Sequence, residues 1–96
     1  MAKKAPTKAE REYMGRVAEL GCAICGGFAE VHHITTGVGM GQRASHYETI
    51  ALCPEHHRTG GHGVAIHAGI KTWEALYGTE IDILALTRIS LGRVNV

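Results

Sequence analysis

The stretch Cys22-Ala23-Ile24-Cys25, followed by His32-His33 and by Cys53-Pro54-Glu55-His56-His57, decides the fold. All three cysteines and all seven histidines of the chain lie between Cys22 and His67. Each of the pairs Cys22/Cys25 and Cys53/His56 is separated by two residues, so each pair can bind one ion from a tight turn. Thiolate and imidazole in this arrangement suit tetrahedral zinc, which contributes folding free energy directly. We therefore predict a structural Zn²⁺ site of Cys22, Cys25, Cys53 and His56, with the other histidines left for function.

A chain of 96 residues predicts one small domain with a modest core, and a structural metal would supply what that core lacks. We expect a basic disordered arm at residues 1–7 and a single domain at residues 8–96. The arm contains Lys3 and Lys4, Lys8 follows it directly, and no acid occurs in this stretch. A solvated terminus is the simpler interpretation of this arm, with DNA contact by Lys3 and Lys4 as an added role.

The cysteine count indicates a reducing compartment. Three cysteines cannot all form internal disulfides, and no apolar stretch resembles a signal peptide or a membrane span. The cytoplasm fits best, because thiols are free there to bind zinc. The alternative is a disulfide from Cys22 or Cys25 to Cys53. We expect no membrane partner.

The formal net charge of +1 does not by itself indicate nucleic acid. Two arginines of the central region, Arg43 and Arg58, could bind phosphate, since guanidinium matches its oxygens bidentately. The alternative is that both are ordinary surface charges.

The elements predict an α+β fold. A helix follows the N-cap Thr7, whose capping-box partner is Glu10, and it ends at Gly21. Short strands are expected at residues 29–34 and 49–52, joined by an exposed, functional loop at residues 35–45. Pro54 then begins a short helix that carries His56, His57 and Arg58.

Two further helices follow. One covers residues 70–77 and buries Trp73. The last begins near Thr79 and Asp82, with Ile81, Leu84 and Ile89 expected in the core.

The spacing of the histidines separates their roles. Neighbours on a strand point to opposite faces, so one of His32 and His33 could hold a metal while the other faces a substrate. His56 and His57 lie about 100° apart on a helix, so His56 can turn to the zinc and His57 to a cleft. His62 and His67 are candidates for the second metal site or for phosphate contact, with His67 favoured.

These residues resemble the zinc-containing HNH, or ββα-metal, endonucleases. More narrowly, they are similar to phage recombination-enhancement nucleases, the RecA-dependent Ref-like group. The similarity covers roughly residues 8–86 and rests on four strings: His32-His33-Ile34-Thr35-Thr36-Gly37, Gly39-Met40-Gly41-Gln42-Arg43-Ala44-Ser45-His46, Leu52-Cys53-Pro54-Glu55-His56-His57-Arg58-Thr59-Gly60-Gly61 and Ile66-His67-Ala68-Gly69.

The resemblance implies a small zinc-stabilised ββα-metal core with flanking N-terminal and C-terminal helices. It makes His33 the general base, and His32 and His57 ligands of a catalytic divalent cation. Magnesium or manganese is usual at such sites, but an all-imidazole site favours a softer ion such as zinc. The implied activity is hydrolysis of DNA phosphodiesters in recombination, with a RecA filament as a partner and a phage or prophage origin.

One position departs from the family pattern. Its middle Asn, which orients the base, would fall near Glu48 or Thr49, and neither is Asn. His46, Glu48 or a backbone carbonyl are the candidates to replace it.

Two other classes compete with the nuclease. A non-catalytic zinc module that binds nucleic acid or protein would not need the surplus histidines. A metal-storage or sensing protein would explain their number but not their ordered pairing.

Overall fold

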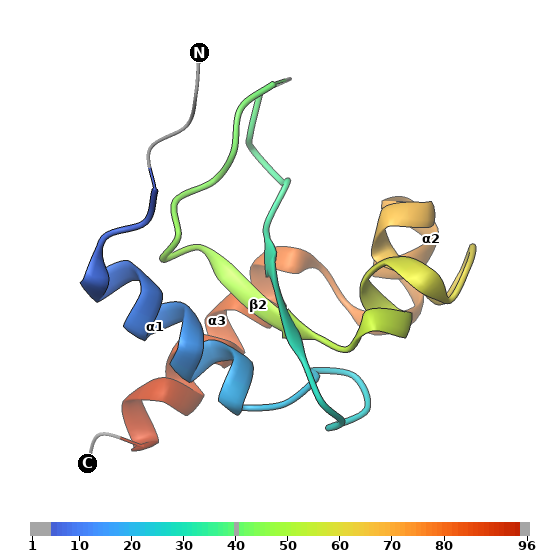
Figure 1. Ribbon diagram of the computed structural model, residues 1–96. Coiled ribbons are helices and arrows are strands. Elements are labelled where there is room, and N and C mark those ends of the chain that lie inside the picture. Colours follow the sequence, from blue (N-terminus) through green and yellow to red (C-terminus); the bar gives the residue numbers. More distant parts are fainter. Residues whose placement is uncertain (1–4, 40, 95–96) are drawn as a thin grey trace.

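The computed structural model describes residues 5–39 and 41–94, and it has an α+β fold, as the sequence predicts (Figure 1). The described elements are, in chain order, α1 (Lys8–Glu19), β1 (Glu30–His33), β2 (Thr49–Leu52), the π-helical turn η1 (Glu55–Thr59), the 3₁₀ turn η2 (Ile66–Ala68), α2 (Ile70–Tyr77) and α3 (Glu80–Val94). Lys3 and Lys4, the expected basic arm, lie outside the described residues. No helix in the described ranges is long and apolar enough to cross a bilayer.

The capping box at the start of α1 is confirmed. The backbone N–H of Glu10 donates to Oγ1 of Thr7 at 3.1 Å, and the N–H of Thr7 donates to Oε1 of Glu10 at 2.8 Å. Beyond the helix end, Gly21 has φ +84°, and a Cβ there would lie 2.9 Å from the carbonyl oxygen of Gly26. Glycine is therefore required where the chain turns from α1 into the cysteine turn.

The two strands form an antiparallel hairpin in which His32 pairs with Ile50 and His33 with Thr49. All four residues of β2 are buried. Both α1 and α3 pack against β2, whereas η1, η2 and α2 gather on the other side of β1 (Figure 1). The turns η1 and η2 carry three of the seven histidines, and Ile66 and Trp73 from this side join the same hydrophobic core as β2.

The last two helices differ in how well the sequence predicts their cores. α2 buries Trp73, whose Nε1–H donates to the carbonyl of Val64 at 3.1 Å. In α3 the expectation is confirmed for Leu84 but is wrong for Ile81 and Ile89, which are about half exposed. The buried face of α3 is instead formed by Glu80, Ile83, Leu84, Thr87 and Leu91. These positions follow the helical period with a charged residue at its start, which is why the apolar pattern alone misplaces the face.

Candidate metal centres

The first centre is a cluster of three thiols and one imidazole. Sγ of Cys25 lies 3.7 Å from Sγ of Cys53, and Nδ1 of His56 lies 3.1 Å from Sγ of Cys53 and 3.8 Å from Sγ of Cys22. Zinc–sulfur bonds of about 2.3 Å at tetrahedral angles place two sulfurs about 3.8 Å apart. All three cysteines are free thiols, so the disulfide alternative is not formed. This Cys₃His cluster could bind a structural metal ion such as zinc.

Backbone hydrogen bonds favour the metal-binding form of one cysteine of the cluster, Cys22. Burial raises the pKa of Cys22, but hydrogen bonds from the backbone N–H groups of Cys53, Cys25 and Ile24 outweigh it and lower the pKa. The result favours the thiolate, which is the form that binds metal. Burial raises the pKa of Cys53. The four ligands come from the turn after α1 and from the junction of β2 with η1. An ion bound there would therefore connect α1 to the end of β2.

The second centre is made of three imidazoles from three elements. His32 of β1, His57 of η1 and His67 of η2 each offer one ligand atom, and these atoms lie within 4.8 Å of one another. Nε2 of His57 and Nε2 of His67 are 2.9 Å apart. The sequence predicts all three as ligand candidates, and the structure brings them together. His62 is exposed and does not join the group within the part of the chain described here.

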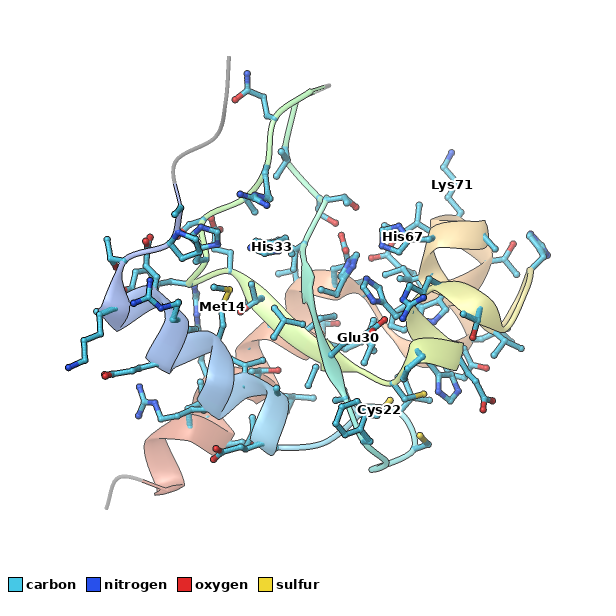
Figure 2. All side chains as sticks on the ribbon, viewed as in Figure 1. Met14, Cys22, Glu30, His33, His67 and Lys71 are labelled. Carbon is cyan, nitrogen blue, oxygen red and sulfur yellow. The ribbon has the colours of Figure 1, made fainter. Side chains whose placement is uncertain are left out.

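An ion pair beside this centre fixes the ring of His57. Oε1 of Glu30 accepts from Nδ1–H of His57 and from Nε–H of Arg58, each at 2.7 Å, and its Oε2 accepts from an Arg58 Nη2 at 3.1 Å. These bonds from Arg58 and His57 lower the pKa of Glu30 to about 2. Figure 2 shows Glu30 and His67 on the same side of β1. Because Nδ1 of His57 is hydrogen-bonded to Glu30, Nε2 is the ring nitrogen that faces the centre.

Two imidazoles of this centre, those of His57 and His67, have a lowered pKa, which favours their neutral form. Burial lowers the pKa of His57, although the hydrogen bond to Glu30 opposes it. Burial and the neighbouring His57 and His32 lower the pKa of His67. Neutral imidazole is the form that binds a metal ion, so the centre suits one at neutral pH.

The buried carboxylate of Glu80 contacts His32, one of the three imidazoles of the centre. Nε2 of His32 lies 2.6 Å from Oε2 of Glu80, the first residue of α3. Burial would raise the pKa of Glu80, but hydrogen bonds from His32, Thr35 and Thr36 outweigh it and lower the pKa to about 2. The sequence prediction misses this residue and Glu30. The signal for Glu80 was a charge placed on the apolar face of the last helix.

His33 occupies the opposite face of β1, as strand alternation predicts. Its Nε2 lies 2.8 Å from Nδ1 of His46, and the hydroxyl of Thr49 donates to the backbone carbonyl of His46 at 3.2 Å. In Figure 2, His33 lies on the side of β1 that faces the loop between the strands, and His67 lies on the side toward α2. Among the candidates to replace the family Asn, His46 thus contacts the ring of His33 through its own side chain.

Two separate hollows lie beside these histidines. One, of about 270 Å³, is lined by His32, His67 and the start of α2. The other, of about 150 Å³, is lined by His33, Arg43 and the loop that follows β1. Thr35 is the lining residue that the two hollows have in common.

The two predicted phosphate-binding arginines have different surroundings. Arg43 is exposed at the rim of the hollow beside His33. The guanidinium of Arg58 is bound bidentately by Glu30, although its side chain remains 56% exposed. DNA contact by either residue stays a prediction.

Residues 1–91 match the family described as "Protein of unknown function (DUF968)". No curated protein matches the chain.

Proposed function

The chain belongs to the DUF968 family, and from its two Cys/His centres we propose that it is a metal-dependent DNA endonuclease of the HNH, or ββα-metal, type. The observation that carries the proposal is the group of His32, His57 and His67 next to the base candidate His33 on the same strand. A zinc module needs only the Cys₃His cluster.

The order of the elements supports this assignment. β1 and β2 form an antiparallel hairpin, and η1 follows it with His56 and His57 on different sides. His56 turns to the thiols, and His57 turns to His67. The resemblance implies a ββα-metal core with two strands and a helical element around the metal, and this order of elements supports the proposal.

The donor set also fits a catalytic cation. Three imidazoles suit zinc and other first-row transition metals better than magnesium, which prefers oxygen ligands. When bound, such an ion would stabilise negative charge on the phosphate and on the leaving 3′ oxygen. We propose a transition metal at this centre, with Mn²⁺ and Mg²⁺ as the ions to be compared with it.

His33 performs the proton transfer in the proposed reaction. As water attacks phosphorus, His33 accepts its proton, and the bond from phosphorus to the 3′ oxygen breaks. His46 holds the ring of His33 through Nε2, and Thr49 fixes the backbone of His46. The phosphodiester would lie against the hollow that His33, Thr35 and Arg43 line.

The proposed substrate is single-stranded or displaced-strand DNA, with a RecA filament as the partner that presents it. The Ref-like strings of the sequence support this part. A net charge of +1 gives little general affinity for phosphate, since neutralisation by Lys and Arg supplies most non-specific binding. A recruiting partner would compensate for that weak affinity.

The test is nicking of circular single-stranded DNA by the zinc-loaded protein. Mg²⁺, Mn²⁺, Co²⁺ and Zn²⁺ are compared as the added ion, each with and without RecA and ATP. His33→Ala should abolish nicking and keep the fold and one tightly bound zinc. His62→Ala is the matched control, because His62 is exposed and outside both centres, and it should cut like the parent.

Equal cutting by His33→Ala and the parent would show that the proposed mechanism is wrong. If the parent binds DNA but cuts none under any of these conditions, the non-catalytic zinc module is the better description.

A further inference from the structure

The carboxyl group of Glu80 is fully buried at the start of α3. A buried charge is costly unless hydrogen bonds compensate it, and an apolar residue of similar size would often be as stable. The backbone N–H of Glu80 donates to Oε2 of Glu74 at 2.8 Å, which fixes the residue at the first turn of the helix. The presence of an acid at this position therefore calls for an explanation beyond packing.

Both oxygens of Glu80 accept hydrogen bonds. Oε1 accepts four hydrogen bonds of 2.8–2.9 Å, from the N–H and the hydroxyl of both Thr35 and Thr36. Oε2 accepts from Nε2–H of His32 at 2.6 Å. With these donors in place, Glu80 is not arranged as a metal ligand. It acts on the centre through His32.

The bond to Glu80 decides which nitrogen of His32 can bind metal. A neutral imidazole carries its proton on one nitrogen and a lone pair on the other. Because the carboxylate accepts from Nε2–H, the lone pair lies on Nδ1. Carboxylates placed in this way fix the tautomer and the ring orientation of a metal-binding histidine and raise its basicity.

We infer that Glu80 is a positioning residue for the three-imidazole centre, which fixes His32 with Nδ1 toward the metal and holds the Thr35–Thr36 turn beside it. This inference rests on the proposal that His32, His57 and His67 bind the second metal ion. It makes the start of α3, 48 residues away in sequence, part of that centre.

The test is the variant Glu80→Gln, with Co²⁺ as the probe. In Glu80→Gln the amide oxygen can replace Oε1, which leaves the NH₂ group facing His32. Nε2 must then accept, so the proton moves to Nδ1 and blocks the metal. Protein with zinc already in the Cys₃His cluster is titrated with Co²⁺, and binding is followed by the d–d absorption of an imidazole-bound ion.

We expect Co²⁺ to bind about 10- to 100-fold more weakly to Glu80→Gln than to the parent, with zinc retention unchanged. Asp82→Asn is the matched control. It removes the same charge from the same helical turn, but Asp82 is exposed, and it should bind Co²⁺ like the parent. Unchanged Co²⁺ affinity in Glu80→Gln would overturn the inference.

A measurement on the parent keeps the inference testable if Glu80→Gln fails to fold. Long-range ¹⁵N–¹H correlation spectra of the zinc-loaded protein report the tautomer of His32. The Nε2–H tautomer is expected, and the Nδ1–H tautomer would overturn the inference. Weaker Co²⁺ binding by Glu80→Gln would support the inference even if the parent cut no DNA, so the two proposals fail separately.

Discussion

At the scale of single residues, a neighbouring side chain contacts a ring nitrogen of each of the candidate catalytic histidines His32, His33 and His57. Glu30 binds His57, Glu80 binds His32 and His46 binds His33. The neighbour determines which nitrogen is presented to a metal or to a substrate. The two acids hold rings that would bind an ion, whereas the base candidate is held by a second imidazole. The ligand candidate His32 and the base candidate His33 thus have different partners and lie on opposite faces of β1.

The first prediction concerns His46. His46→Ala removes the group that meets Nε2 of His33, so the base loses its orientation but not its ability to accept a proton. We expect nicking to slow by about 10- to 100-fold, since small misplacements of a reacting group have effects of this size. The loss should be smaller than that of His33→Ala, and Co²⁺ binding at the three-imidazole centre should not change. Parent-like nicking by His46→Ala would contradict this role.

The second prediction is the pH dependence of the second metal centre. The pKa values of His57 and His67 lie below the ordinary value of 6.5. Because protonated imidazole cannot bind metal, a lowered pKa moves the competition by protons to more acidic solution. Co²⁺ affinity of the zinc-loaded protein should hold from about pH 8 down to about pH 6.5 and fall below that. An affinity that already declines above pH 7 would contradict the burial effect.

At the scale of the elements, the sequence predicts most of the order and bounds. The capping box of α1, the strand Thr49–Leu52 and the helix Ile70–Tyr77 depend on local signals, and each is confirmed. The Cys₃His cluster is predictable because two-residue spacing restricts its geometry.

Glu30, Glu80 and the turn η2 could not be found in the same way. The role of Glu30 depends on a contact across 27 residues and that of Glu80 on a contact across 48, which no local pattern encodes. The face of α3 was misplaced for the same reason, since its buried charge is compensated by partners from β1 and the loop that follows it.

The third prediction compares two glycines in or beside helical elements. A Cβ at Gly15, inside α1, would meet nothing within 4 Å, so Gly15→Ala should raise the free energy of unfolding by about 0.5–1 kcal/mol. A Cβ at Gly60, which ends η1, would lie 2.5 Å from Cγ1 of Val64 and 2.6 Å from the carbonyl oxygen of Glu55. Gly60→Ala should therefore destabilise the protein, by about 1–3 kcal/mol.

Urea unfolding of the zinc-loaded variants measures both effects. Gly60→Ala should also weaken Co²⁺ binding, because the turn after η1 sets the distance between His57 and His67. Equal stability of the two variants would contradict the close packing at Gly60.

At the scale of the whole molecule, the thiol cluster joins parts that the modest core would otherwise leave loosely connected. Cys22 and Cys25 follow α1, while Cys53 and His56 join β2 to η1. The ring of His56 lies 5.5 Å from that of Tyr77, which lies 5.3 Å from the ring of Trp73. A chain of aromatic contacts thus runs from the cluster into the buried face of α2. The single tryptophan is placed to report the state of the cluster.

The fourth prediction is that removal of the ion from this cluster unfolds the protein. Structural zinc contributes about 10–16 kcal/mol of apparent binding free energy, whereas a small domain is stable by about 5–15 kcal/mol in total. Chelation, or Cys25→Ala, should therefore shift the fluorescence of Trp73 to the red and abolish cooperative unfolding. His67→Ala removes a ligand of the other centre, and it should keep the buried-tryptophan spectrum and one bound zinc while losing Co²⁺ binding. If chelated protein kept a cooperative transition, the core would be sufficient without metal, and the cluster would have to be explained by a task other than folding.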